Sequence, residues 1–332
     1  MRISVIVPVR NEEQSVSNLL EGLLEQSLTP DEIIITDGGS TDSTPSIINR
    51  YIQQRETIQL IANGPALPGR GRNLGAARAT AEWLAFIDAG VRPRKNWLEF
   101  LAQCVLDNDG ADVVYGSYEP IVRTLFEECA AICYVPPKTN RKEGWIRAPS
   151  IVSALIRKSV WVSVGGFPEH LRSAEDLIFI RNVEQAEFRI FYAPQAIVDW
   201  EIQRTYTDTF KRFAVYSLNN IRAGLWGQWQ AAIFKRYFLL VLSALPTFII
   251  GVRWLLIAGG FLLLMLVGRA IQSIRRNRNC YPAGIGRNLL RLTVLVPLIA
   301  TIDVAMFWGT IKWVLHDRLH VLGERLGVSN GT

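Results

Sequence analysis

Two short apolar runs in this chain each lead directly into an aspartate. Residues 33–36 precede Asp37, and residues 83–87 precede Asp88. Runs of this length and composition are typical of buried parallel strands, whose carboxyl ends lie at one edge of a sheet. Ligands of open α/β sheets bind at that edge. Two carboxylates delivered there predict a polar site for a sugar, a base or a metal ion.

Two adjacent acids, Glu175 and Asp176, open a predicted helix farther along the chain. A carboxylate can remove a proton from a reacting hydroxyl group, and a like-charged neighbour raises its pKa. The alternative is that both acids only cap the positive end of that helix. Asp37 has a similar alternative, because its side chain could cap a tight turn at Gly39.

Strands and helices alternate in the part of the chain that carries these acids. The predicted strands are 3–9, 32–36, 58–61 and 83–87, with helices that begin near residue 11, near residue 45 and after a glycine- and arginine-rich loop at 64–75. This order predicts a doubly wound, mostly parallel α/β sheet. Farther on we expect a helix at 96–106, strands at 112–118, 151–157, 188–193 and 197–200, an irregular segment at 119–149 and a helix at 206–223.

The composition indicates a membrane-associated protein rather than a nucleic-acid-binding one. Of the 332 residues 49% are hydrophobic, the net charge is +6, and the apolar excess lies after about Tyr237. Many arginines neighbour these apolar segments, which fits an anionic membrane surface. The four cysteines lack paired metal-ligand spacing and are expected to be buried thiols. The first strand begins at once, so we expect no signal peptide and a cytoplasmic globular part.

Residues 237–267 are apolar except for Arg253. As one helix they would measure roughly 46 Å, long for one crossing of a ~30 Å hydrocarbon core and short for two. We therefore expect a hairpin of helices at about 237–251 and 254–268, followed by a further span at 292–314. Six arginines between residues 268 and 291 favour a cytoplasmic loop, which a single tilted helix would place outside. A soluble helical subdomain is the alternative.

Asp303 is the acidic residue inside the last apolar span. An ionisable group at such a position is a functional candidate by default. It could instead pair with Arg253 or Lys312 within the helix bundle, and we favour that structural role.

Five motifs follow one another in the first two thirds of the chain. They are VIVPVRNEE at 5–13, TDGGSTD at 36–42, GRNLG at 71–75, FIDAG at 86–90 and AED at 174–176. This ordered set resembles the family 2 glycosyltransferases of the GT-A fold, over roughly residues 1–220, and the apolar tail resembles membrane-attached members. The resemblance implies a glycosyltransferase domain at 1–230 and membrane-associated helices at 231–332.

The resemblance implies a nucleotide-sugar donor, with a uridine-type base as the expectation from the family. Pro8, Arg10 and Glu12 would line the nucleoside pocket at the end of the first strand. Asp37, with Gly39 beside it, would accept the imide hydrogen of the base, a role that suits a carboxylate. Three further residues would contact the donor, the last of them its diphosphate: Arg72, Asn73 and Arg212.

Asp88 matches the first acid of the family's Asp-x-Asp motif, which contacts ribose or a metal-bound diphosphate. Gly90 stands where the second acid would be. Three interpretations remain open. Asp88 holds Mg²⁺ or Mn²⁺ together with water and phosphate oxygens, which suit such ions; a nearby arginine (Arg72, Arg92 or Arg94) supplies the positive charge instead; or the enzyme is weak or inactive.

The resemblance implies inverting transfer with Asp176 as the general base and Glu175 as its orienting neighbour. The expected acceptor is a lipid-linked or growing glycan, and the expected location is the cytoplasmic membrane with the catalytic domain facing the cytoplasm. A degenerate member that binds a nucleotide sugar or a partner without transfer is the alternative. A dinucleotide-dependent oxidoreductase is disfavoured, because no Gly-x-Gly-x-x-Gly follows the first strand.

Overall fold

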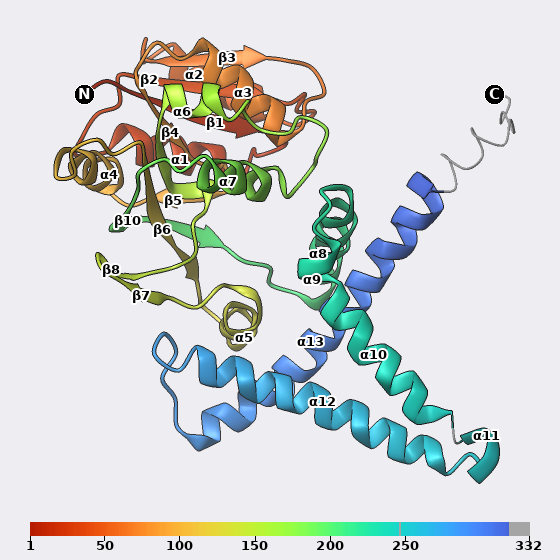
Figure 1. Cartoon of the computed structure of the whole chain (residues 1–332). Helices are drawn as coiled ribbons and strands as arrows, with labels where there is room; N and C mark the ends of the chain where they lie inside the picture. Colours follow the sequence, from red (N-terminus) through yellow and green to blue (C-terminus); the bar gives the residue numbers. More distant parts are fainter. Residues whose placement is uncertain (246, 319–332) are drawn as a thin grey trace, which may run out of the picture. The chain divides into compact units, whose positions relative to one another are not determined.

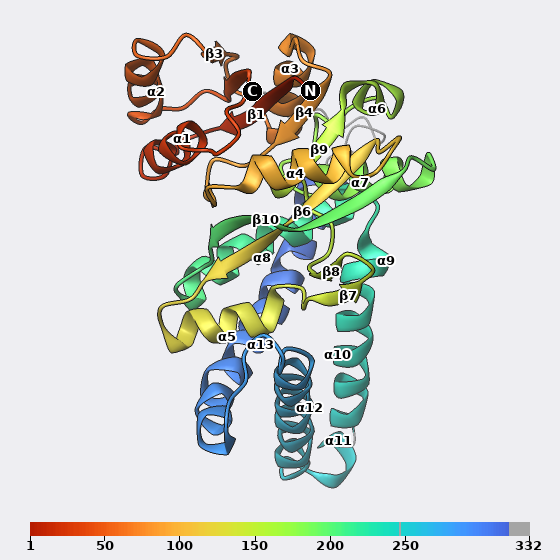
Figure 2. The ribbon, with the colours of Figure 1, turned by 90° about the vertical axis from the view of Figure 1, so that its left-hand side faces the viewer.

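The computed structural model describes residues 1–245 and 247–318. The chain forms two compact units. The first unit comprises Met1–Ile121 and Pro136–Glu201, and the second comprises Val122–Val135 and Ile202–Thr332. Figures 1 and 2 show the same ribbon from two directions.

The first unit is built on an eight-stranded sheet in the order β3-β2-β1-β4-β9-β6-β10-β5. Strands β3, β2, β1 and β4 are parallel, as are β6 and β10, whereas β9 and β5 run antiparallel to their neighbours. The mixed, mostly parallel sheet confirms the predicted fold class. The strands are β1 Ile3–Val9, β2 Glu32–Asp37, β3 Ile58–Ala62, β4 Trp83–Phe86, β5 Val91–Pro93, β6 Val113–Ile121, β9 Ala154–Arg157 and β10 Ile190–Glu201.

Most helices of the first unit follow the strands as the sequence predicts. The helices are α1 Val16–Leu24, α2 Thr44–Ile52, α3 Pro68–Arg78, α4 Trp97–Leu106, α6 Lys158–Ser163 and α7 Glu175–Gln185. Helix α1 begins five residues later than expected, and α6 was not expected. A 3₁₀ turn at Ile151–Ser153 precedes β9, so the strand expected at 151–157 begins three residues late. The two strands expected at 188–193 and 197–200 are one strand, β10, with an irregularity between Tyr192 and Ile197.

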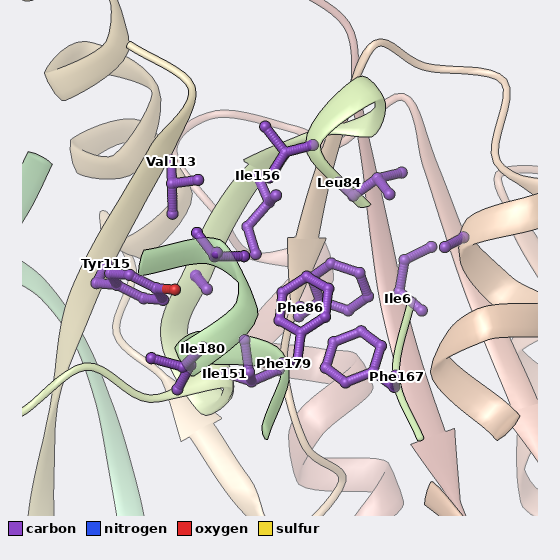
Figure 3. Close-up of a cluster of buried hydrophobic side chains, with 14 of the residues drawn as sticks. Ile6, Leu84, Phe86, Val113, Tyr115, Ile151, Ile156, Phe167, Phe179 and Ile180 are labelled. Atoms are coloured by element: carbon purple, nitrogen blue, oxygen red, sulfur yellow. The ribbon is translucent and has the colours of Figure 1, made fainter. Parts of the chain in front are cut away.

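A buried aromatic cluster joins the sheet to α7 (Figure 3). The Phe167 ring stacks on Phe179 of α7 with the centroids 4.0 Å apart, and it meets Phe86 of β4 edge-on at 5.3 Å. Aromatic pairs in these geometries stabilise a core beyond their buried area. The cluster therefore fixes the start of α7, and with it the acid pair, relative to the carboxyl end of β4.

The glycine-rich segment at 64–75 is a loop only up to Leu67, because helix α3 begins at Pro68 and contains three of its glycines. A Cβ at Gly75 would lie 2.6 Å from Ile6 Cγ2, and one at Gly71 would lie 2.9 Å from Thr36 Oγ1. The two glycines are four residues apart and so lie on one helix face. Their small size lets α3 pack directly on β1 and β2, a role that the loop prediction missed.

The segment at 119–149 is also more regular than expected. It contains α5 Leu125–Tyr134 and a hairpin of β7 Thr139–Arg141 with β8 Gly144–Ile146. Helix α5 begins with a capping box, in which Glu127 N donates to Thr124 Oγ1 at 3.2 Å and Thr124 N donates to Glu127 Oε2 at 2.9 Å. This Thr-x-x-Glu pattern is a sequence signal for a helix start.

The second unit is helical in the residues that the structure describes. Besides α5 it contains α8 Tyr206–Arg222, α9 Trp226–Trp229, α10 Ala231–Ala244, α11 Thr247–Ile250, α12 Trp254–Arg276 and α13 Ile285–Trp313, with a π-helical turn at Val314–Arg318. By length and composition, two helices could cross a membrane: α12, and the continuous helix over Ile285–Asp317. The expected segment at 237–251 is divided between α10 and α11, and residue 246 lies outside the described residues.

Two expectations about the charged residues of the second unit are wrong. The arginine-rich stretch at 268–291 is mostly helix, because α12 extends to Arg276 and α13 begins at Ile285. Asp303 pairs with neither Arg253 nor Lys312. It accepts hydrogen bonds from both terminal nitrogens of Arg269 and from the Tyr237 hydroxyl, which lies at 3.0 Å. The structural role itself, an ion pair inside the helix bundle, is the one that the sequence favoured.

Candidate active site

Two loops at the carboxyl ends of β1 and β2 are joined by hydrogen bonds. Asn11 N donates to Ser40 Oγ at 2.9 Å, and Thr41 N donates to Asn11 Oδ1 at 2.8 Å. One residue further on, Glu12 N donates to Thr44 Oγ1 at 2.8 Å. Asn11 has a φ of +56°, a conformation that asparagine tolerates better than most residues. Sequence reasoning missed this link, although the paired Asn-Glu-Glu and Ser-Thr-Asp motifs contain its partners.

Asp37 ends β2 inside this pair of loops and is buried. Its Oδ1 accepts hydrogen bonds from Ser40 N at 3.0 Å and Ser40 Oγ at 2.6 Å. Gly39 lies inside the turn with a φ of +79°, which glycine adopts without strain. The turn-capping alternative for Asp37 is thus present. Within the described part of the chain both hydrogen bonds use Oδ1, so Oδ2 has no protein donor.

The predicted nucleoside-pocket residues of the first loop differ in their surroundings. Pro8 is half-buried beside Gly71, whereas Arg10 is exposed. Glu12 Oε2 accepts a short hydrogen bond from Ser15 Oγ. The pKa of Glu12 is raised, first by burial and then by the negative charges of Asp88 and Asp42, although the Ser15 bond lowers it. Glu12 and Asp88 therefore share one electrostatic environment.

Arg72 of α3 is the buried cation of this edge of the sheet. One terminal nitrogen donates to Asp88 Oδ1 at 2.6 Å, and the other donates to Glu175 Oε1 at 2.6 Å. Arg72 Nε and Glu175 Oε2 are buried without a hydrogen-bond partner among the described residues. Buried polar atoms usually have hydrogen-bond partners. These two atoms can therefore still form hydrogen bonds to water or to a ligand.

The acid pair lies at the first turn of α7. Glu175 is buried, and Asp176 Oδ1 accepts a hydrogen bond from Leu177 N at 2.9 Å. Burial and the charges of Glu175 and Asp88 raise the pKa of Asp176 to about 6, while Arg72 and the Leu177 bond lower it. The residue before the pair, Ala174, has a φ of +70°. Strained backbone of this kind clusters at functional sites, and sequence reasoning gave no signal of it.

Asn73, the neighbour of Arg72, holds the segment that precedes the acid pair. Its Nδ2 donates to Phe167 O at 2.9 Å and to Glu169 Oε1 at 3.0 Å, and its Oδ1 accepts from Phe167 N at 2.8 Å and from Trp161 Nε1 at 3.1 Å. A side-chain amide offers two donor hydrogens and two acceptor positions. All four are used, so the expected donor contact of Asn73 has no free hydrogen-bonding position in this conformation.

The second position of the Asp-x-Asp motif is open space. A Cβ built at Gly90 has no heavy atom within 4 Å, apart from its chain neighbours. Asp88 is 43% exposed at its side chain and is already paired with Arg72. The described residues contain no group of three or more His, Cys, Asp or Glu side chains that could hold a metal ion. A cation at Asp88 would therefore need ligands besides protein carboxylates, such as phosphate oxygens and water.

The structure brings most of the predicted site residues to one edge of the first unit. Arg212 is the exception, because it belongs to α8 in the second unit. There its Nε donates to the Tyr216 hydroxyl at 2.7 Å, and the guanidinium lies 5.3 Å from the centre of that ring. The expected diphosphate contact of Arg212 stays a prediction.

The mixed sheet with an acidic carboxyl edge has the architecture of a GT-A-like fold. The mannosyltransferase PcManGT from Pyrobaculum calidifontis, solved in complex with GDP-Man and Mn²⁺, superposes with a TM-score of 0.54 at 16% identity. The match covers 95% of this chain and 88% of that one. At this identity the likeness concerns the fold alone.

Residues 4–161 match the family model for glycosyl transferase family 2, and the chain thus carries a domain of that family, as the sequence motifs predict. It is 25% identical over 201 residues to glycosyltransferase AglE of Haloferax volcanii, covering 59% of this chain and 65% of that protein. It is 28% identical over 229 residues to the pre-mycofactocin glycosyltransferase of Mycobacterium tuberculosis, covering 64% and 46%. The chain thus spans about half to two thirds of the length of these relatives.

Proposed function

We propose that this protein is a membrane-attached inverting glycosyltransferase that moves a sugar from a nucleotide-sugar donor to a lipid-linked or glycan acceptor. The observation that carries the proposal is Asp176. Its carboxyl group has a pKa raised to about 6 and lies in one electrostatic cluster with Arg72 and Asp88. A base with a pKa near the working pH combines a useful deprotonated fraction with a stronger driving force for proton transfer.

Donor binding uses the joined loops at the carboxyl ends of β1 and β2. Asp37 Oδ2 would accept the imide hydrogen of a uridine-type base, while Oδ1 keeps the turn closed through Ser40. Pro8 and Glu12 would line the same pocket. A carboxylate that is already fixed by its own hydrogen bonds loses little conformational freedom when it binds the base. The family membership supports a nucleotide-sugar donor of this kind.

The transfer step is a single displacement at the anomeric carbon. The acceptor hydroxyl oxygen forms a bond to that carbon while its proton passes to Asp176. The bond between the anomeric carbon and the phosphate oxygen breaks, and the nucleoside diphosphate leaves with the electron pair. Attack from the face opposite the leaving group inverts the configuration. Arg72 holds Glu175 beside Asp176, and the electrostatic effect of Glu175 raises the pKa of Asp176 and with it its basicity.

The diphosphate's charge must be balanced, and the described residues contain no group of three or more His, Cys, Asp or Glu side chains that could hold a metal ion. Asp88, together with phosphate oxygens and water, would hold Mg²⁺ or Mn²⁺, and such an ion would neutralise the diphosphate as it leaves.

Membrane attachment is supported by the exposure of α12. In its most apolar window only 17% of the residues are buried, whereas the core helix of a soluble protein would be mostly buried. Attachment of the enzyme to a bilayer suits a lipid-linked acceptor. We propose that the catalytic unit faces the cytoplasm, because the arginines at the end of α12 and the start of α13 favour that side.

A nucleotide-sugar-binding protein without transferase activity is the second candidate. Gly90 and the engagement of Asp88 by Arg72 favour it, since both reduce the acidic groups available to a metal-bound diphosphate. The acid pair at the start of α7 favours transfer instead.

One experiment separates the two candidates. The detergent-purified full chain is incubated with a panel of nucleotide sugars and a lipid extract, with Mg²⁺, Mn²⁺ or EDTA, and release of nucleoside diphosphate is measured. Turnover with one donor supports transfer, and binding without turnover supports the second candidate. Asp88→Ala should weaken donor binding in calorimetry, whereas Asp109→Ala, which removes an exposed acid, should not. Unchanged affinity in the Asp88 variant would remove that donor contact.

A further inference from the structure

The second unit carries most of the large apolar side chains that the described structure leaves exposed. On the hairpin of α10, α11 and α12 they lie along both arms and at the tip, for example Phe238, Leu242, Ile249, Leu256, Phe261 and Leu264. Apart from Arg253, the sequence 237–267 contains no charged residue. A helix that is apolar all round requires an apolar environment on all sides, and an exposed patch of this size marks an interaction surface.

Helices α10 and α12 pack side by side and converge on α11 (Figure 2). The tip is closed by Trp254 Nε1, which donates to Ser243 O at 2.7 Å. Gly251, with a φ of +104°, and the exposed Arg253 form the turn. The hairpin is therefore a defined structural element with one charged residue at its tip.

The length of the hairpin arms argues against two complete crossings. The charged residues that flank Arg253 along the chain are Arg236 on α10 and Arg269 on α12. Each apolar arm is thus about 15 residues, or roughly 23 Å of helix at 1.5 Å per residue. The hydrocarbon core is about 30 Å thick. An arm of this length enters deeply but does not span, and a long arginine side chain at the tip can extend towards the far headgroups.

Helix α13 differs from the hairpin because one of its faces is buried by protein. Near its start Leu295 and Ile299 pack with Cys129 and Ile132 of α5. Farther along, Ser217 Oγ of α8 donates to Met306 O at 2.6 Å. A Cβ at Gly309 would lie 2.5 Å from Ala214 O, so the two helices are in close backbone contact there.

Helix α8 accompanies α13 over most of its length. Tyr206, the first residue of α8, donates from its hydroxyl to Val294 O at 3.4 Å, and Arg222, its last residue, pairs with Asp317 at 2.6 Å. Asp208 and Lys211 are exposed on α8. If α13 crossed the bilayer, α8 would enter it too. Each charged side chain at the bilayer centre costs about 2.5–3.5 kcal/mol even on the lowest scale.

From these contacts, and resting on the membrane attachment proposed above, we infer that the second unit is a monotopic anchor. The α10–α12 hairpin inserts into the bilayer from one side and returns to that side. Helix α13 stays at the membrane surface, with α5 and α8 on one face and its exposed apolar residues towards the lipid. The latter include Ile285, Leu289, Trp308 and Ile311. This replaces the expected third span at 292–314 by a surface helix.

Charge complementarity selects an anionic bilayer as the partner. Exposed cations lie where both hairpin arms emerge and where α13 begins, at Lys235, Arg236, Arg275, Arg276, Arg278 and Arg287. Juxtamembrane lysines and arginines each contribute about 1 kcal/mol of attraction to an anionic leaflet. Trp308, with Lys312 lying 5.7 Å from its ring centre, is typical of a membrane interface.

Two cysteine positions at opposite ends of α13 test the inference. Cys280 lies in the connection between α12 and α13, and Lys312 is exposed at the far end of α13. The full chain, with the other three cysteines replaced by alanine, is expressed in bacterial cells with and without Lys312→Cys. A membrane-impermeant maleimide is then applied to intact cells and to inside-out vesicles.

A monotopic anchor predicts that both cysteines react in inside-out vesicles and that neither reacts in intact cells. A spanning α13 would give one reactive position in each preparation and would overturn the inference. A chain that stays in the supernatant after ultracentrifugation would instead contradict the membrane attachment of the proposed function. Since buried Cys129 is lost in this background, a fusion of green fluorescent protein to the C-terminus of the unaltered chain provides a second measurement. A C-terminus on the cytoplasmic side should give a fluorescent fusion. An active alkaline phosphatase fused at the same position would place the C-terminus outside and contradict the inference.

Discussion

Replacing Asp176 with asparagine should abolish transfer and at the same time stabilise the fold. The asparagine Oδ1 can still accept the hydrogen bond from Leu177 N, so the start of α7 is preserved. The carboxyl pKa rises from the ordinary 3.8 to about 6 in the folded protein. Because each unit corresponds to 1.36 kcal/mol, ionised Asp176 destabilises the fold by at most about 3 kcal/mol above pH 6.

The sign follows from the direction of the shift. The folded state binds the proton more tightly than the unfolded chain, so the stability of the wild-type protein falls as pH rises from about 4 to about 6, and the asparagine variant lacks this loss. Thermal unfolding of the detergent-purified chain, followed by tryptophan fluorescence, should show the variant several degrees more stable at pH 7.5 and little different at pH 4.

The activity of the wild-type protein should have the matching pH dependence. Since the base must be deprotonated, kcat/KM, which reports the protonation state of the free enzyme, should fall about tenfold per pH unit below pH 6. Donor affinity of the Asp176→Asn variant, measured by calorimetry, should remain near that of the wild type. Normal turnover by the variant would remove Asp176 as the base, and an unchanged melting temperature at pH 7.5 would refute the electrostatic reasoning.

Further substitutions test the surroundings of the site. Arg72→Met should cost about 3–5 kcal/mol of stability in denaturant unfolding, because it leaves Glu175 buried without its partner; a second change, Glu175→Leu, should recover much of that loss. Gly75→Val should destabilise the fold by about 1–3 kcal/mol, because its Cβ would meet Ile6 Cγ2 at 2.6 Å. Gly90→Asp should fold normally in its open position and should tighten Mn²⁺ binding in the presence of nucleoside diphosphate, and identical metal titrations would contradict this.

The positions of the strands and of their terminal acids could be predicted because each depends on a local pattern. An apolar run that leads into Asp37 or Asp88 predicts both the strand and the acid at its carboxyl end. The start of α7 at Glu175 also follows from local sequence. The prediction of a loop up to Gly75 failed because glycine occurs both in flexible loops and in helices that pack closely against a strand. Composition does not distinguish the two cases. The close approach of Ile6 to Gly75 shows that the second applies here.

The pairing of charges could not be read from local sequence, because the partners are far apart along the chain. Arg72 and Glu175 are separated by 103 residues, and Asp303 lies 34 residues from Arg269. A motif names the residue types that a site requires but not which of them neutralise each other. The four hydrogen bonds of the Asn73 amide could not be predicted for the same reason, because three of them come from a segment about 95 residues away.

The charge balance of the site limits how a donor can bind. Glu12, Asp88, Glu175 and Asp176 share one edge of the sheet, and the buried cation among them, Arg72, already serves two of these carboxylates. A diphosphate would add further negative charge. A movement of the Arg72 terminal nitrogens towards the phosphates would break the 2.6 Å contact with Asp88, whereas a contact through the unpartnered Nε would leave that pair in place. The half-exposed Asp88 is the partner that can be released, because Glu175 is buried and would remain unpaired. Donor binding that draws Arg72 to the diphosphate would therefore free Asp88 for the ribose or for a cation that arrives with the donor.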